Sequence, residues 1–282
     1  MLRLDQKWAA VIGSPIRHSL SPVLHRTAYE VLGLKWDFTV HEVSAQGLSG
    51  YLGSLGEDCV GLAVTMPNKQ AIMPYLDSID GLAKAVGAVN TVAFSASMMT
   101  GFNTDVHGIV ETVKGLAEEK QLHLGKNKHA VILGTKATAS SALAAAVTLG
   151  FDKISIVGRS FEGSGSVLLA AGRLGVDFDP VLWKHPARVL DVCKTADLLI
   201  STVPLQATEH LAQELHPKKS MAVLDVTYGD GKTPLGVAYT NADAVVLSPL
   251  AMLVHQGLAQ VKLWSGLEAP FEPVYRAVLE AA

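Results

Sequence analysis

Short apolar segments alternate with longer segments rich in alanine and leucine along most of the chain. The short segments have the length and composition of buried strands, and the longer ones have the apolar spacing of helices. Parallel strands need crossover helices between them, because the chain must return to the same end of the sheet before the next strand begins. The alternation therefore predicts an α/β fold built on largely parallel sheets.

Two series of such segments follow one another. In the first third of the chain the pattern predicts strands at 9–13, 36–42 and 60–65, and helices at 22–32, near 45–55 and at 106–119. A second series of predicted strands lies at 130–133, 153–157, 197–202, 221–226 and 244–247. Residues 139–149 are almost all small or apolar, so the first two strands of this series and the helix between them form a βαβ unit. The polar segment 120–128 between the two series has the composition of a surface linker.

The end of the chain is predicted to be helical. Apolar residues recur at intervals of three and four after Ser248, and Pro270 and Pro273 interrupt the pattern before a last short helix. At 282 residues the chain can build two modest cores or one large core.

Composition narrows the function classes. The 23 Lys and Arg against 26 Asp and Glu give a net charge of −3, which argues against binding to nucleic acid or to an anionic membrane surface. No apolar run reaches the roughly 20 residues of a membrane span, and Asp5 and Lys7 interrupt the place of a signal peptide. Cys59 and Cys193 show neither CxxC nor zinc-ligand spacing. We therefore expect free thiols, no metal site and a cytoplasmic location.

Hydroxyl side chains follow the first predicted strand. Ser19 and Ser21 precede Pro22, which suits the first turn of a helix whose amides are unsatisfied. Two hydroxyls at this spacing could hold a carboxylate. The alternative is that Ser21 caps the helix while Ser19 faces water.

A lysine and two Asn-Thr pairs occupy later turns. Lys69 follows the strand at 60–65, and the ends of strands are where open α/β sheets bind ligands. A lysine there could donate a proton, although a surface lysine at a helix start is the more common case. The segments 87–91 and 101–105 contain the Asn-Thr pairs, and Asn and Asp also favour turns for purely local reasons.

The turn after the first strand of the second series resembles a dinucleotide-binding turn with one change. In the G-x-G-x-x-A register its positions are Gly134, Lys136 and Ala139, so the middle glycine is missing. The turn nevertheless follows a strand, opens a helix and lies in a βαβ unit. Arg159 follows the second strand with no acidic residue at the strand end, which favours a ribose 2′-phosphate and hence NADP over NAD.

The order of these motifs resembles that of the shikimate dehydrogenase family, including its quinate/shikimate paralogues. The resemblance covers nearly the whole chain and rests on the motifs at 19–22, 64–69, 87–91, 103–105, 225–235 and 252–256. It implies NADP-dependent, reversible reduction of 3-dehydroshikimate to shikimate in aromatic amino-acid biosynthesis. It also implies a substrate domain at residues 1–106 plus 247–282 and a Rossmann-like NADP-binding domain at 107–246.

The resemblance implies roles for individual residues. Lys69 and Asp105 would be the catalytic pair. The substrate-binding residues would be Ser19 and Ser21 on the carboxylate, Thr65, Asn90 and Gln256 on the ring hydroxyls, and Tyr228. The cofactor-binding residues would be Gly134, Thr135, Lys136, Ala137, Arg159 and Ser160. The expected partners are small molecules only, and the expected assembly is a monomer or homodimer.

Departures from the family pattern leave alternatives open. Ala63 replaces an asparagine, Pro249 replaces a glycine expected near the nicotinamide, and Lys136 replaces the middle glycine. In one interpretation Lys136 contributes its ammonium to a phosphate and NADP still binds. In another the chain is a paralogue with an altered cofactor site, either a quinate/shikimate dehydrogenase or a non-catalytic shikimate-binding protein. A scaffold protein of the same fold is a third hypothesis.

Overall fold

A computed structural model describes residues 7–95, 98–120, 127–163, 165–227 and 232–282. The chain divides into two compact units, Met1–His107 with Leu253–Ala282 (unit 1) and Gly108–Met252 (unit 2). The chain leaves unit 1 within helix α5 (Asp105–Lys120) and re-enters it within α11 (Pro249–Ser265). The boundaries expected from the sequence, after residues 106 and 246, fall near the starts of these two helices.

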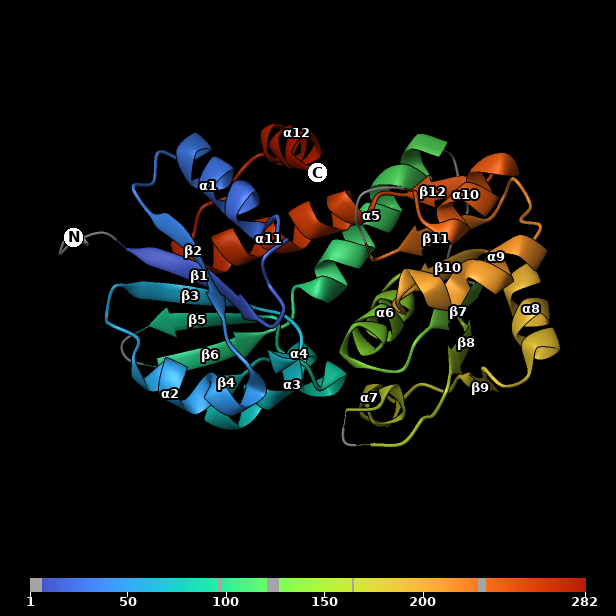
Figure 1. Ribbon diagram of the computed structural model, residues 1–282, viewed down its shortest axis with the longest axis horizontal. Coiled ribbons are helices and arrows are strands. Elements are labelled where there is room, and N and C mark those ends of the chain that lie inside the picture. Colours follow the sequence, from blue (N-terminus) through green and yellow to red (C-terminus); the bar gives the residue numbers. More distant parts are fainter. Residues whose placement is uncertain (1–6, 96–97, 121–126, 164, 228–231) are drawn as a thin grey trace. The chain divides into compact units, whose positions relative to one another are not determined.

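Unit 1 contains a six-stranded mixed sheet in the order β2-β1-β3-β5-β6-β4 (Figure 1). Strand β1 is parallel to β2 and β3, β5 is antiparallel to both β3 and β6, and β4 is parallel to β6. The strands are β1 (Trp8–Gly13), β2 (Asp37–Glu42), β3 (Cys59–Val64), β4 (Ser78–Ile79), β5 (Thr91–Ser95) and β6 (Met98–Phe102).

Helices cover both faces of this sheet (Figure 1). One face carries α1 (Ser21–Val31), α11 and α12 (Phe271–Ala281), and the other carries α2 (Leu48–Gly53), α3 (Asn68–Ala71) and α4 (Gly81–Val86). Helix α11 lies close to the strands because Gly61 has no side chain. A Cβ there would come 2.0 Å from the Trp264 indole, whose Nε1 donates a hydrogen bond to the Val92 carbonyl. The face toward α2, α3 and α4 is closed by a buried cluster that includes Ile12, Leu62 and Val92.

Unit 2 contains a wholly parallel sheet in the order β12-β11-β10-β7-β8-β9. Numbered within the unit, this is the 3-2-1-4-5-6 order of the Rossmann fold, with its switch point between β7 and β10. The strands are β7 (His129–Leu133), β8 (Lys153–Gly158), β9 (Asp179–Leu182), β10 (Leu198–Ser201), β11 (Ala222–Asp225) and β12 (Val245–Leu247).

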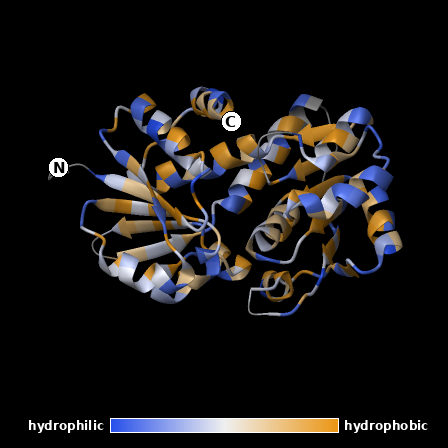
Figure 2. Ribbon diagram, in the orientation of Figure 1, coloured by the Kyte–Doolittle hydropathy of each residue, from blue (hydrophilic) through white to orange (hydrophobic). Residues whose placement is uncertain are grey.

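The core of unit 2 forms because its central strands are apolar on both faces, as parallel strands covered by helices must be (Figure 2). Residues 139–146 of α6 are all buried, and their small side chains let the helix approach the sheet. The helices of this unit are α6 (Ala137–Thr148), α7 (Val167–Leu174), α8 (Pro186–Lys194), α9 (Glu209–Glu214) and α10 (Pro234–Asn241).

The structure differs from the sequence prediction in several elements. The helix expected near 45–55 is a 3₁₀ turn (Ala45–Gly47) followed by α2, and further 3₁₀ turns lie at Met73–Tyr75 and Leu205–Thr208. Strand β9 was not predicted, because Val181 is its only buried residue. Pro273 does not interrupt α12, since the first helical turn needs no intrahelical donor at that position. Residues 121–126 of the expected linker lie outside the described residues. None of the described helices is long and apolar enough to cross a membrane.

Candidate active site

Strand direction in unit 1 brings three polar segments to one edge of the sheet. Strands β3 and β6 run in the same direction, and β5 runs the opposite way between them. The ends of β3 and β6 therefore lie beside the beginning of β5. Lys69 follows β3 in α3, Asn90 immediately precedes β5, and Asp105 follows β6 as the first residue of α5.

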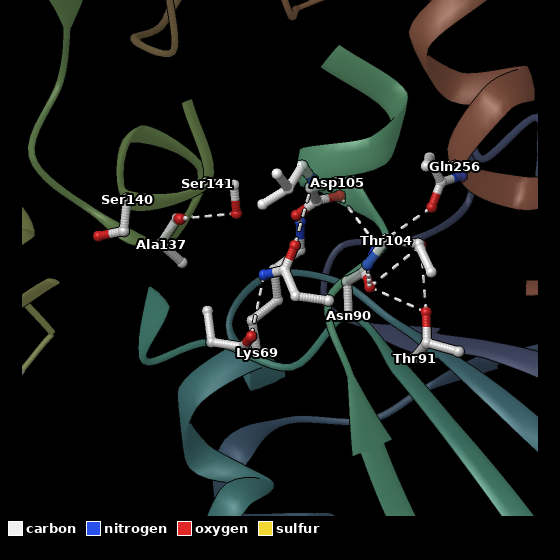
Figure 3. A network of polar contacts seen from close by, with 12 residues as sticks. Lys69, Asn90, Thr91, Thr104, Asp105, Ala137, Ser140, Ser141 and Gln256 are labelled. Atoms are coloured by element: carbon white, nitrogen blue, oxygen red, sulfur yellow. Dashed lines mark hydrogen bonds and ion pairs between the residues drawn. The ribbon is translucent and has the colours of Figure 1, made fainter. Parts of the chain in front are cut away.

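Lys69 and Asp105 form an ion pair at this edge (Figure 3). The Lys69 Nζ atom lies 2.6 Å from Asp105 Oδ2, and the two side chains are 15% and 7% exposed. The position of Asp105 in the first turn of α5 also favours its negative charge, because the helix dipole is positive there. The arrangement holds an ammonium group, with protons to give, in a place from which most water is excluded.

Asn90 is the centre of the hydrogen-bond network around the pair (Figure 3). Its Nδ2 group lies within hydrogen-bond distance of Asp105 Oδ1 at 2.9 Å, Thr104 Oγ1 at 2.9 Å and Gln256 Oε1 at 3.2 Å. Its Oδ1 accepts from the Thr104 N–H at 2.7 Å and lies 2.8 Å from the Thr91 hydroxyl. Asn90 thus engages one oxygen of the carboxylate while the lysine engages the other, which fixes the plane of the carboxylate.

Gln256 joins the network from a distant part of the sequence. It lies on α11, 166 positions after Asn90, and its Nε2 donates to the Leu253 carbonyl at 2.8 Å. This bond directs the Gln256 oxygen toward Asn90. Of the predicted site residues, the structure therefore links Lys69, Asp105, Asn90 and Gln256 directly.

The three predicted hydroxyls of unit 1 are placed differently. The Ser19 Oγ accepts a hydrogen bond from the Ser21 N–H at 3.2 Å, and Ser21 is the buried first residue of α1. The alternative in which Ser21 caps the helix is wrong, because Leu20 occupies the N-cap position and Ser21 is already the first helical residue. Thr65 lies half-buried directly after β3, where its N–H donates to the Ile12 carbonyl. Within the described part of the chain, none of these hydroxyls contacts the ion pair through a hydrogen bond.

Unit 2 contains a cavity of about 590 Å³ at the carboxyl ends of its central strands. Loops that follow β7, β8 and β10 line it, and Trp183 after β9 adds an aromatic wall. This is the switch point of the sheet, where Rossmann folds bind dinucleotides. The cavity includes five of the six residues predicted for the cofactor: Gly134, Thr135, Lys136, Arg159 and Ser160. The sixth, Ala137, is the first residue of α6.

The turn at the start of α6 explains which glycine the chain needs. Gly134 has φ +120°, and a Cβ there would lie 2.1 Å from Thr202 Oγ1. Lys136 instead has φ −101° and ψ −166°, an extended conformation open to any residue. The backbone therefore requires a glycine at 134 and accepts a lysine at 136. The Thr135 side chain packs against Gly158, and its carbonyl accepts from the Val167 N–H, so Thr135 serves packing.

Two cations line the cavity. Lys136 and Arg159 are both exposed, and neither has an acidic partner among the described residues. The first turn of α6 has no acidic residue, so its amide groups and the lysine form a positive end. Ser160 accepts from the Glu162 N–H at 3.1 Å, and its own O–H can donate to a ligand. The residues present thus fit a nucleotide that carries phosphate groups.

Comparison with known proteins decides the family. Residues 11–92 match the family described as Shikimate dehydrogenase substrate binding domain, and residues 250–279 match Shikimate 5'-dehydrogenase C-terminal domain. A relative from Methanopyrus kandleri, named Shikimate dehydrogenase (NADP(+)), is 32% identical over 96% of this chain and 94% of its own length. The chain belongs to the shikimate dehydrogenase family. The predicted family is therefore confirmed.

Solved structures of shikimate dehydrogenases confirm the α/β two-sheet fold. The enzyme from Mycobacterium tuberculosis is 32% identical with a TM-score of 0.84, over 98% of this chain and 100% of that chain. The enzyme from Thermus thermophilus, in complex with NADP(H) and shikimate, is 25% identical with a TM-score of 0.81, over 98% and 100%.

Several residues of the network were not predicted. Thr91 and Thr104 stand beside predicted residues in the two Asn-Thr pairs, and that adjacency was the signal. Gln260 lies one helical turn after Gln256 on α11, and His25 one turn after Ser21 on α1. A polar residue on the same face of an apolar helix was the only clue to either. Tyr228 lies outside the described residues.

Proposed function

We propose that this protein catalyses the reversible, NADP-dependent reduction of 3-dehydroshikimate to shikimate in aromatic amino-acid biosynthesis. The observation that carries the proposal is the Lys69–Asp105 pair, held at 2.6 Å and joined through Asn90 to Gln256. The names of the relatives and the NADP(H) and shikimate in the Thermus thermophilus structure support the choice of reaction.

Lys69 acts as the proton donor in this proposal. When bound, NADPH supplies the hydride, and negative charge develops on the substrate oxygen. The Lys69 ammonium stabilises that charge and gives the oxygen a proton, and in the reverse direction the neutral amine takes the proton back. Most water is excluded from the lysine, so its charge acts on the substrate with little screening.

Asp105 and Asn90 orient the donor. The carboxylate directs the Lys69 side chain through a 2.6 Å hydrogen bond, and the Asn90 amide holds the carboxylate through its second oxygen. We assign Asn90, Gln256 and Thr65 to the ring hydroxyls of the substrate. Each presents a hydroxyl or an amide at the same edge of the sheet or on the helix packed against it.

Ser19 and Ser21 are assigned to the substrate carboxylate. Ser21 begins α1, whose N-terminal amides have no side-chain cap at Leu20, and this end of a helix favours an anion. Tyr228 is retained as a further substrate ligand on the basis of the family pattern alone.

Unit 2 is assigned as the NADP-binding domain and unit 1 as the substrate domain. The α6 N-terminus, with Gly134, Thr135 and Ala137 in its turn, would receive the pyrophosphate, assisted by Lys136. Arg159 and Ser160 would hold the 2′-phosphate. The intact ion pair and these two free cations argue against a non-catalytic shikimate-binding protein.

The experiment is an assay of 3-dehydroshikimate reduction with NADPH and NADH, and of oxidation with shikimate and quinate. Nucleotide binding is followed separately by Trp183 fluorescence, because the other three tryptophans, at 8, 36 and 264, belong to unit 1. Turnover with NADPH and shikimate supports the proposal. Shikimate binding without nucleotide binding or turnover would refute it, and a clear preference for quinate or NADH would refute the substrate or cofactor assignment.

We also propose a cytoplasmic location and a monomer or homodimer. Both thiols are free and buried, and burial raises the pKa of each to about 12, which suits a protein that needs no disulfide. Light scattering on the purified protein measures the assembly directly, and a mass larger than that of a dimer would refute it.

A further inference from the structure

His25 is a fully buried histidine for which the proposed mechanism has no use. It lies on α1, four residues after Ser21, and is 0% exposed. Its ring stacks on Phe38 at 4.0 Å between ring centroids and on Trp264 at 5.3 Å. Stacking alone would be served equally well by a phenylalanine, so the two ring nitrogens need a separate explanation.

Both nitrogens make hydrogen bonds that lead toward the candidate active site. Nδ1 lies 2.8 Å from the Ser21 carbonyl, and Nε2 lies 3.1 Å from Gln260 Oε1. The other end of the Gln260 amide lies 3.2 Å from the Asn90 carbonyl oxygen and 3.0 Å from the Thr91 hydroxyl. The Thr91 hydroxyl lies 3.2 Å from the Thr104 hydroxyl, which accepts from the Asn90 amide at 2.9 Å. A continuous buried chain therefore runs from the start of α1 to the residue that holds Asp105.

The protonation of His25 sets the direction of this chain. Burial lowers the pKa of His25 to about 4, so the ring is neutral at neutral pH and has one N–H. The Ser21 carbonyl can only accept, which places the proton on Nδ1 and leaves a lone pair on Nε2. The Gln260 amide matches this lone pair after a half turn that points its N–H at the ring.

The half turn of the Gln260 amide also sets which groups donate and which accept between Gln260 and Asn90. After it, the Thr91 hydroxyl donates to the Gln260 oxygen, and the Thr91 oxygen accepts from the Thr104 hydroxyl 3.2 Å away. The Thr104 oxygen in turn accepts from the Asn90 amide at 2.9 Å, and the Asn90 carbonyl keeps its 2.7 Å hydrogen bond from the Val64 N–H. The hydrogen bonds then run in one direction from Asn90 through Thr104, Thr91 and Gln260 to His25.

We propose that His25 and Gln260 are positioning residues, which fix the orientation of the Asn90 amide and through it the Lys69–Asp105 pair. The proposal rests on the proposed function for its kinetic consequence. Neither His25 nor Gln260 is assigned a contact with the substrate. The two residues act through Thr91 and Asn90, so they belong to one unit and their effects must not add.

The test uses the variants His25→Phe, Gln260→Met and the double variant. Phenylalanine keeps the stacking on Phe38 and Trp264, and methionine keeps the length of the glutamine, so each variant mainly removes hydrogen bonds. His129→Phe is the matched control: His129 is a buried histidine bonded to Thr195 and Ser155 at the far end of β7 from the cavity. The readouts are kcat and KM for shikimate, and the NMR signals of the Asn90 side-chain amide, assigned with Asn90→Asp.

Each single variant should lower kcat by about 3- to 10-fold, the effect of about one well-placed hydrogen bond, while KM stays within about threefold. The double variant should be no slower than the slower single variant, and His129→Phe should keep the wild-type kcat. An unchanged kcat in the single variants, or effects that multiply in the double variant, would overturn the proposal.

A failure of the proposed function is told apart by the NMR readout. If the wild-type protein shows no shikimate oxidation, the reaction assignment fails and the Asn90 signals decide on the positioning alone. The same displacement of these signals in both single variants, with none in His129→Phe, supports positioning. Signals that stay in place overturn it.

Discussion

Replacement of Lys69 by alanine should remove the proton donor while leaving the substrate residues in place. The ammonium lies 2.6 Å from Asp105 Oδ2, and the lysine side chain is only 15% exposed, so bulk water replaces it poorly. A positioned acid contributes about 10²- to 10⁴-fold to turnover, and we expect Lys69→Ala to lower kcat by that factor. The dissociation constant of shikimate should rise by less than about tenfold, since Lys69 acts on charge that forms during the reaction.

The same substitution has a cost in stability that the structure also indicates. Asp105 is 7% exposed, and among the described residues its carboxylate keeps only the Asn90 hydrogen bond when the ammonium is gone. Removing one partner of a buried ion pair costs about 3–5 kcal/mol, so unfolding should begin several degrees lower. A second replacement, Lys69→Ala with Asp105→Asn, should recover part of this stability without recovering turnover.

The assay follows NADPH absorbance during shikimate oxidation and measures shikimate binding by calorimetry on the same samples. Lys84→Ala is the matched control, because Lys84 is an exposed lysine in the last turn of α4. Turnover of Lys69→Ala within tenfold of the wild type would refute the role of Lys69 as the acid. So would a loss of turnover that weaker shikimate binding explains entirely.

Three further predictions concern other residues. Arg159→Gln removes the cation assigned to the 2′-phosphate, so it should weaken NADPH binding by about tenfold or more with little effect on NADH binding. Lys153→Gln, at the opposite end of β8, should change the affinity for neither nucleotide. A fluorescence titration measures both affinities. Gly134→Ala should lower the unfolding free energy by several kcal/mol, because the φ of Gly134 is +120° and a Cβ there would overlap the Thr202 side chain. Gly172→Ala, in open space on α7, should raise the unfolding free energy by up to about 1 kcal/mol. Equal effects of the two variants in denaturant titrations would contradict this prediction. Burial lowers the pKa of His25 to about 4 in the folded protein, so the unfolded chain binds a proton more readily between pH 6.5 and 4. The free energy of unfolding should therefore be highest above pH 6.5 and drop by about 3 kcal/mol as the pH falls to 4. His25→Phe should flatten this pH dependence, and an unchanged pH dependence would refute the view that His25 is buried in its neutral form.

Much of the fold could be predicted because it depends on local pattern. The apolar runs that became β1, β3, β7, β8 and β10 are buried at all positions or all but one, and the small-residue run at 139–146 became the buried part of α6. These elements follow from the periodicity of the backbone and from the cost of exposing apolar surface, which a sequence window contains. Strand β9 escaped because it contributes little to the core.

In the candidate site, too, local sequence pattern supplied some of the information and tertiary structure the rest. The sequence by itself supplied the motifs that contain Lys69, Asn90 and Asp105, and it showed that position 134 carries the glycine of a strand-to-helix turn. Tertiary structure alone decided that these motifs meet: β5 runs antiparallel between β3 and β6, and α11 brings Gln256 and Gln260 to Asn90 from more than 160 positions away. The physical reason is that a hydrogen bond depends on the positions of two groups within a few tenths of an ångström. Strand direction, register and helix packing set those positions, and no local stretch of sequence contains them.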